Sequence, residues 1–158
     1  MELTMFFTKR YSWLLVLLLL SGCIVHGQEG KLEPLTIETA AGDTVHYRIE
    51  LAVSQRDKER GLMFRESLPE DQGMLFVYRP EHEASMWMKN TLLPLDMVFI
   101  DRDGRIVRIA GDTVPGSLKI ISSGAKVRAV LELNAGQAAK HGIKPGDTVR
   151  HPVFEERD

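Results

Sequence analysis

The chain has 158 residues, with 20 Lys and Arg side chains against 22 Asp and Glu, so its formal net charge is −2. This length is typical of one domain, and the nearly balanced charge does not favour a nucleic-acid binder, which would carry a clustered basic excess. Hydrophobic residues make up 44% of the chain, which excludes a disordered protein, and the single cysteine excludes an internal disulfide framework. We therefore expect one globular domain with no nucleic-acid partner.

The N-terminus has the pattern of a secretory signal. Lys9 and Arg10 precede an unbroken apolar run over residues 13–20, which is shorter than the roughly 20 residues that a transmembrane helix needs. Residues 20–23, Leu-Ser-Gly-Cys, resemble the bacterial lipobox, at which a peptidase cuts before a cysteine that becomes lipidated. The resemblance implies that Cys23 is the acylated first residue of the mature protein. The alternative is an ordinary signal peptide cut after Gly27, which would release a soluble periplasmic or secreted protein.

Lipidation would make a membrane the first partner of the mature protein, because two or more acyl chains anchor a protein stably. Ile24 follows the cysteine. In Gram-negative lipoproteins an Asp at this position commonly causes retention at the inner membrane, so the resemblance implies the periplasmic face of the outer membrane. We divide the chain into a signal peptide (1–22), a lipidated cysteine with a tether (23–33), one domain (34–154) and a polar tail (155–158).

The elements expected in the domain are mainly β-strands. Segments 36–38 and 45–53 alternate apolar and polar residues around a turn, which predicts a hairpin. Two short helices are predicted at 54–60, capped by Ser54, and at 135–141, capped by Asn134. Further strands are expected at 74–78, 84–89, 96–101, 105–110, 128–133 and after Asp147. Many short strands with two small helices predict a compact β-rich α+β domain, a closed or half-closed barrel.

Familiar catalytic and metal-binding motifs fail on their spacing. His82-Glu83 begins like a zinc-protease helix, but Met86 stands where the second histidine is required. Residues 123–126 fit the Ser-x-x-Lys pattern of serine acyl-enzymes, but the Ser-Asp-Asn and Lys-Thr-Gly motifs that accompany it are absent. We therefore expect no metal and no cofactor, and we assign no catalytic residue.

One polar cluster interrupts an apolar stretch over residues 85–100, next to Trp87. In a strand over 84–89, Trp87 and Lys89 would face the same side, where the indole could stack on a ring while the amine binds its oxygens. The alternative is that Trp87 fills the core while the polar residues only satisfy the backbone of a turn. The polar residues of the cluster are Lys89, Asn90, Thr91 and Asp96.

Asp96 would need a partner if it is buried, because an unpaired carboxylate is costly in an apolar environment. The candidate partners are Lys89, Arg60, Arg65 and the backbone N–H groups of the turn at 92–94.

Six segments match, in order, the pattern of the family catalogued as domain of unknown function 192. They are 61–65 (Gly-Leu-Met-Phe-Arg), 73–76 (Gly-Met-Leu-Phe), 87–91 (Trp-Met-Lys-Asn-Thr), 94–97 (Pro-Leu-Asp-Met), 130–136 (Val-Leu-Glu-Leu-Asn-Ala-Gly) and 146–147 (Gly-Asp). The resemblance covers about residues 35–153. It implies a small β-rich domain that is frequently exported and has no established activity, and it supplies no substrate.

Three functional hypotheses stay open, and the sequence slightly favours the first. This is a non-catalytic module that binds a small polar molecule, a glycan or an envelope protein. The second is an envelope hydrolase or lyase with Asp96 or Glu132 as general base and Lys89 or Arg60 stabilising an oxyanion. The third is a structural or assembly factor without a ligand pocket. The candidate ligand-binding residues are Arg60, Arg65, Trp87, Lys89, Asn90, Thr91, Asp96 and Glu132.

Overall fold

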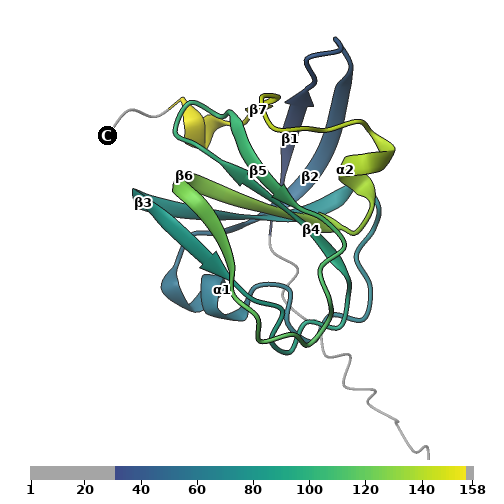
Figure 1. Cartoon of the computed structure of the whole chain (residues 1–158), viewed down its shortest axis with the longest axis vertical. Coiled ribbons are helices and arrows are strands. Elements are labelled where there is room, and N and C mark those ends of the chain that lie inside the picture. The colour runs from purple at the N-terminus through teal and green to yellow at the C-terminus, as the bar shows by residue number, and fades with distance from the viewer. Residues whose placement is uncertain (1–30, 156–158) are drawn as a thin grey trace, which may run out of the picture.

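The computed structural model describes residues 31–155 (Figure 1). The predicted signal peptide, Cys23, Ile24, most of the expected tether and residues 156–158 lie outside the described residues. Within 31–155, no helix has the length and apolar character needed to cross a membrane.

Residues 31–155 form seven strands, two α-helices and one 3-10 helix. In chain order these are β1 (Leu32–Glu38), β2 (Thr44–Ala52), α1 (Gln55–Arg60), β3 (Gln72–Met86), β4 (Leu95–Ile100), β5 (Ile106–Ala110), β6 (Ile121–Asn134), α2 (Gln137–Lys140), β7 (Thr148–Arg150) and η1 (Pro152–Phe154).

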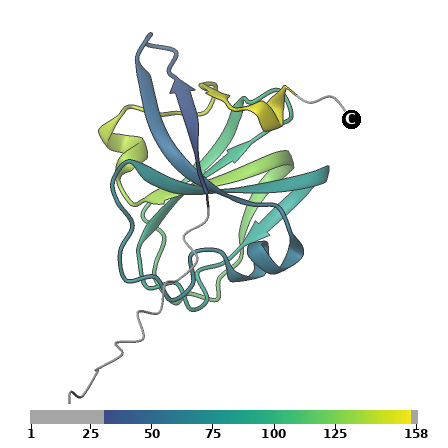
Figure 2. The same ribbon diagram turned by 180° about the vertical axis from the view of Figure 1, so that it is seen from behind.

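The strands form a single sheet in the order β5-β4-β6-β3-β2-β1-β7. Neighbouring strands are antiparallel except β2 and β3, which are parallel. The sheet curls until its two edges meet, where the N–H of Ile106 donates to the carbonyl of Asp147 (2.9 Å) and the N–H of Val149 donates to that of Gly104 (2.7 Å). The result is a nearly closed barrel with two small helices, seen from behind in Figure 2, which confirms the predicted fold class.

The sheet is apolar on both faces. One cluster contains residues of all seven strands, among them Leu75, Val98 and Leu131, and fills the barrel. The other covers the opposite face of β3, β4 and β6 and includes Phe76 and Met97. Because successive side chains of a strand point to opposite faces, β4 is apolar at every position except Asp96, and residues 129–131 of β6 are a continuous apolar run that serves both clusters.

Several strand boundaries differ from those predicted, and β6, expected at 128–133, begins at Ile121. The segments expected at 74–78 and 84–89 are one strand, β3, which continues past shifts in its register with β6. This strand ends at Met86, so Trp87 and Lys89 lie in the loop that follows. Strand β1 begins at Leu32, inside the range assigned to the tether.

The two helices differ in how well the sequence marks them. Helix α1 begins as predicted, with the Ser54 hydroxyl accepting the N–H of Asp57 at 3.1 Å. Helix α2 is shorter than predicted and has Gly136 at its N-cap. The side chain of Asn134 instead donates to the carbonyl of Leu68 (2.8 Å), so it fastens a distant loop rather than capping the helix.

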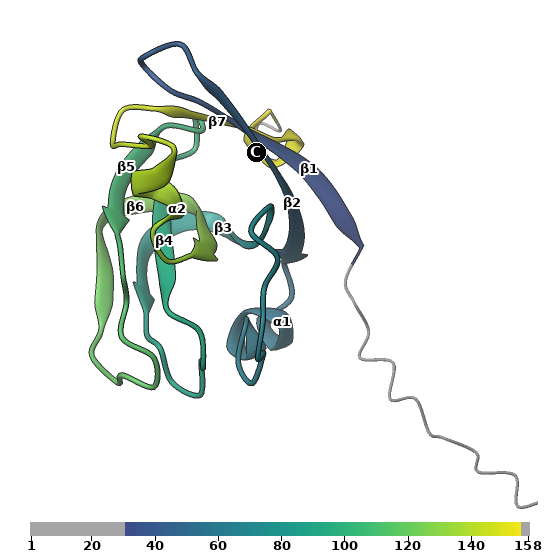
Figure 3. The ribbon, with the colours of Figure 1, turned by 90° about the vertical axis from the view of Figure 1, so that its right-hand side faces the viewer.

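Three loops at one end of the barrel, residues 61–71, 87–94 and 111–120, are bonded to one another. The N–H of Phe64 donates to the carbonyl of Asn90 (2.9 Å), and the N–H of Met88 donates to that of Ser117 (3.0 Å). We call these three loops the loop platform. Figure 3 shows it at the same end of the molecule as α1.

Candidate functional site

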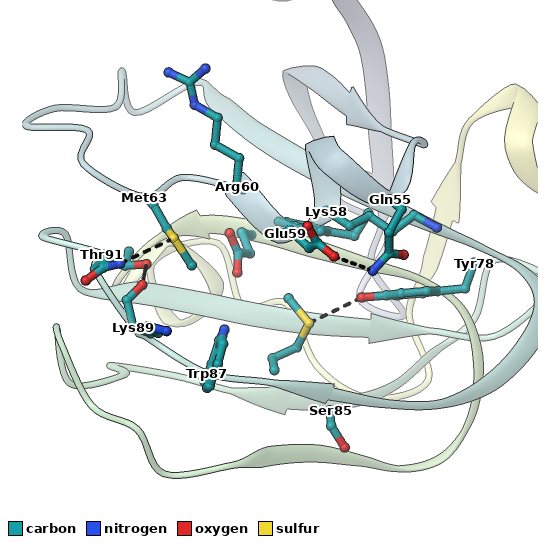
Figure 4. A pocket seen from close by; sticks show the side chains of 15 residues that line it. Gln55, Lys58, Glu59, Arg60, Met63, Tyr78, Ser85, Trp87, Lys89 and Thr91 are labelled. Carbon is teal, nitrogen blue, oxygen red and sulfur yellow. Dashed lines mark hydrogen bonds between the residues drawn. The ribbon is translucent and has the colours of Figure 1, made fainter.

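A solvent-open cavity of about 520 Å³ lies between α1 and the segment at 85–91 (Figure 4). This volume falls in the range of roughly 300–1,000 Å³ that is typical of small-molecule sites. Its lining residues are Gln55, Lys58, Glu59, Arg60, Gly61, Met63, Phe76, Tyr78, Ser85, Met86, Trp87, Lys89, Asn90, Thr91 and Glu132. Aromatic and methionine side chains therefore share the cavity with charged groups.

Six of the eight candidate residues line this cavity, although they come from three separate parts of the chain. One comes from the last turn of α1, four come from the loop after β3, and one comes from β6. These six are Arg60, Trp87, Lys89, Asn90, Thr91 and Glu132. Arg60 belongs to the rim, because its side chain points away from the other labelled residues in Figure 4.

Trp87 and Lys89 lie next to each other, although the strand over 84–89 from which the sequence predicted this is wrong, because both residues belong to the loop after β3. The indole is 44% exposed, and the Nζ of Lys89 lies 5.0 Å from the centre of its ring. A cation over an aromatic face contributes about 0.5–1 kcal/mol at an exposed site. The indole is therefore available to a ligand at the cavity, and the alternative that Trp87 fills the core is wrong.

Glu132 is a buried carboxyl group in the cavity lining. It is 4% exposed and pairs in register with Met74 of β3 and Met97 of β4. Burial raises its pKa to about 8, because apolar surroundings disfavour the charged form. Within residues 31–155, no hydrogen bond or ion pair engages its carboxyl oxygens. At neutral pH the group is therefore mostly protonated and can donate a hydrogen bond to a bound molecule.

Tyr78 lies beside Glu132 and was not marked by the sequence. Burial and, to a smaller degree, the charge of Glu132 raise the pKa of Tyr78 to about 12. Its hydroxyl contacts the sulfur of Met86 at 3.3 Å, and the Nζ of Lys58 lies 5.0 Å from the centre of its ring. Tyr78 and Lys58 reach the cavity from the middle of β3 and from α1, and no local motif could have shown that these two segments meet there.

Asp96 lies outside the cavity, which corrects its place among the candidates. It is 2% exposed and accepts the N–H groups of Ala138 (2.9 Å) and Asp112 (3.1 Å). None of the predicted partners, whether a cationic side chain or the turn at 92–94, is bonded to it in the described residues. Because Asp96 pairs with Leu133, the neighbour of Glu132, its side chain faces the opposite side of the sheet. It holds the start of α2, and it is not a general base for this cavity.

Arg65 is also outside the lining. Its guanidinium donates two hydrogen bonds to the carboxylate of Glu50, at 2.5 and 2.7 Å. A bidentate pair of this kind fixes the loop at 61–71 against β2.

Asn90 and Thr91 serve the backbone as well as the cavity. Asn90 has a φ of 55° and its carbonyl accepts the N–H of Phe64. The hydroxyl of Thr91 donates to the carbonyl of Lys89 at 3.3 Å. The side chain of Thr91 therefore hydrogen-bonds the backbone of its own turn, which is the alternative that the sequence analysis left open. Thr91 also lines the cavity.

Metal-ligating side chains do not gather in the part of the chain that the structure describes. No group of three or more His, Cys, Asp or Glu residues within 31–155 is placed to hold an ion.

Comparison with known proteins agrees with the sequence motifs. The model of domain of unknown function 192 (Uncharacterized ACR) matches residues 36–151. A crystal structure of a proposed transcription regulator from Sinorhizobium meliloti 1021 is 44% identical and superimposes with a TM-score of 0.76, covering 77% of this chain and 95% of that one. A protein of unknown function from Novosphingobium aromaticivorans DSM 12444 is 37% identical with a TM-score of 0.76, covering 80% and 89%. No curated protein matches. The chain belongs to the domain of unknown function 192 family.

Proposed function

We propose that the chain is an exported envelope protein, held on the periplasmic face of the outer membrane by lipid on Cys23, whose domain binds a small ring-containing polar ligand. The basic and apolar N-terminus and the lipobox-like residues 20–23 support export and anchoring. The cavity between α1 and residues 85–91 supports ligand binding. A glycan unit is the ligand class that fits best.

The single observation that carries the binding proposal is that Glu132 and Trp87 line the same solvent-open cavity. The carboxyl group of Glu132 is 4% exposed and lines the cavity, where burial disfavours its charged form. A ligand that accepts its proton in a hydrogen bond would supply a polar partner at this position. The half-exposed indole offers the same ligand an apolar face.

These groups favour an N-acetylated sugar over a simple anion. A protonated carboxyl donates to a neutral acceptor such as an amide carbonyl, and it would repel an anion once ionised. The flat indole of Trp87 suits the apolar face of a sugar ring, and the amine of Lys89, 5.0 Å from the centre of the indole ring, lies close enough to donate to the hydroxyl groups of that sugar.

The proposal is tested by titrating the protein with N-acetylglucosamine oligomers while following the emission of Trp87, the only tryptophan after residue 13. We expect a saturable change in emission and a higher melting temperature, since a ligand that binds only the folded state stabilises it. Glu132→Leu should abolish both effects, whereas Glu66→Gln, on an exposed position outside the cavity, should leave them unchanged. Unchanged emission and melting temperature over the whole titration would refute the assignment of this ligand class.

A second candidate function, acid–base catalysis, is favoured by the raised pKa of Glu132 in an open cavity. A carboxyl with a pKa of about 8 would donate a proton to a leaving group at neutral pH, and Lys89 would stabilise developing negative charge. Incubation with envelope glycan followed by mass spectrometry would distinguish the two functions. Cleavage lost in Glu132→Gln supports catalysis, while intact glycan that still binds supports a binding module.

The Sinorhizobium relative is described as a proposed transcription regulator, and that role is not part of our proposal. The net charge of −2 does not favour a nucleic-acid partner for this chain.

A further inference from the structure

We propose that the loop platform docks on the phospholipid surface of the membrane, so that the ligand cavity opens beside the bilayer. This docking surface goes beyond the lipid anchor at Cys23, on which it rests for its proximity to the membrane. The anchor would tether the domain, and the platform would orient it.

The platform carries most of the exposed large hydrophobic residues of the region 31–155. Five large hydrophobic side chains, each more than half exposed, lie on its three loops. Trp87, which is 44% exposed, lies on the loop at 87–94. Single exposed apolar residues are ordinary, whereas a cluster of them marks a contact surface for protein or membrane. The five are Phe64, Leu92, Val114, Leu118 and Ile120.

The loops that carry these side chains are held together by backbone hydrogen bonds. Phe64 is bonded to Asn90, Met88 to Ser117, and the N–H of Gly116 donates to the carbonyl of Thr91 at 3.1 Å. The three loops that carry the apolar side chains therefore form one connected unit. A surface that is already ordered does not lose further backbone entropy when it enters a membrane.

Phe64 provides an independent reason to expect a contact here. Its φ is 63°, a left-handed conformation that costs a residue with a Cβ about 1–2 kcal/mol. Phe64 is 68% exposed, so its side chain gains little packing within residues 31–155 to offset this cost, and the conformation is held by the backbone bond to Asn90. Backbone strain that displays an aromatic ring to solvent is understandable when the ring has an external partner.

The residues between the apolar tips match the interface of a bilayer. Lys119 lies between Leu118 and Ile120 and is exposed, and Lys89 lies beside Trp87. Tryptophan is enriched at the depth of lipid headgroups, and lysine binds their phosphates. The apolar side chains are therefore flanked by the two residue types that lipid interfaces prefer.

The start of the domain lies next to this platform. Leu32, at the beginning of β1, pairs with Glu50, whose carboxylate is bound by Arg65 in the first platform loop. Eight residues, 24–31, separate this strand from Cys23, and at a maximum of roughly 3.3–3.6 Å each they span less than about 30 Å. A lipid on Cys23 would hold the platform close to the bilayer, and the resulting high local lipid concentration makes lipid the occupant that we infer.

The experiment uses the full acylated protein, reconstituted into vesicles of phosphatidylethanolamine and phosphatidylglycerol in which some acyl chains carry bromine. Two variants each place one tryptophan in the mature protein. Trp87→Phe with Leu118→Trp puts the indole on the platform, and Trp87→Phe with Ala41→Trp puts it in the exposed β1–β2 turn. We expect brominated lipid to quench and non-brominated lipid to blue-shift the first indole, while neither lipid affects the second.

Two further measurements separate the possible failures. In the chain with Trp87 intact, Leu118→Asp with Ile120→Asp should remove lipid quenching of Trp87. Equal quenching of the platform and turn indoles would overturn the docking surface. The proposal would also be overturned if Leu118→Asp with Ile120→Asp disrupted a dimer of this protein but left the lipid quenching of Trp87 unchanged. The acyl mass on Cys23, read by mass spectrometry from the same samples, decides the anchor separately, and its absence would refute the anchor alone.

Discussion

Asp96 and Glu132 lie on adjacent strands, β4 and β6, and point to opposite faces of the sheet. Asp96 pairs in register with Leu133 and Glu132 pairs with Met97, so one residue of offset separates two carboxyl groups with different surroundings. Asp96 accepts two backbone N–H groups, whereas Glu132 has no hydrogen-bond partner in the described residues and lines the cavity. The first carboxyl holds the backbone at Asp112 and at the start of α2, and the second is a group that can respond to a ligand or to pH.

The stability of the domain should fall as pH rises through the range set by Glu132. Its carboxyl has an ordinary pKa of 4.5 when unfolded and about 8 when folded. Between these values the folded state holds a proton that the unfolded state has lost, so each step upward in pH favours unfolding. We expect the free energy of unfolding to decrease by a few kcal/mol over this range because of this group. Urea denaturation at several pH values measures it.

The matched variants for this pH dependence are Glu132→Gln and Glu66→Gln. The first removes the buried ionisable group and should flatten the decline between pH 4.5 and about 8. The second removes an exposed carboxyl and should leave it unchanged. A Glu132→Gln protein with the same pH dependence as the parent would contradict the raised pKa.

Replacing Asp96 should weaken the fold more than it weakens binding. Asp96→Ala leaves the N–H groups of Asp112 and Ala138 without their acceptor, in a position that is 2% exposed. Leaving the buried N–H of Ala138 unsatisfied costs about 1–3 kcal/mol, whereas water can reach the N–H of the exposed Asp112. Chemical denaturation should show this loss. Ligand affinity measured well below the unfolding transition should stay within twofold of the parent, and a selective loss of affinity would return Asp96 to the site.

Trp87→Ala should weaken ligand binding without a comparable loss of stability. The indole is 44% exposed, so its removal opens little space in the apolar clusters. Loss of the aromatic contact should reduce affinity for the sugar about tenfold, corresponding to roughly 1.4 kcal/mol. Isothermal calorimetry against Trp87→Phe, which keeps an aromatic face, provides the comparison. Equal affinities for the Ala and Phe variants would argue against stacking.

Cys23→Ala should abolish acylation and cause unprocessed precursor to accumulate. The lipobox-like residues 20–23 place this cysteine where a lipoprotein peptidase would cut. Labelling cells with radioactive palmitate, followed by membrane fractionation and N-terminal sequencing, measures both effects. A parent protein recovered without acyl chains and beginning at Gln28 would show instead that an ordinary signal peptidase cuts after Gly27.

Local sequence patterns were sufficient for much of the fold. Alternation of apolar and polar residues marked the hairpin of β1 and β2, and Ser54 with Asp57 marked the start of α1, because these signals act between near neighbours. The end of β3 at Met86 and the short α2 were not foreseen. Both depend on long-range contacts, such as the bond from Asn134 to Leu68.

The sequence by itself determined the fold class and the family of this protein, and it brought attention to Trp87, Lys89 and Glu132. Only the tertiary structure decided which of two nearby carboxyl groups serves the cavity. The burial and partners of Asp96 and Glu132 come from α2, from the loop at 112 and from strands far away in the chain. A single strand's periodicity tells which residues share a face, but the environment of that face depends on what packs against it.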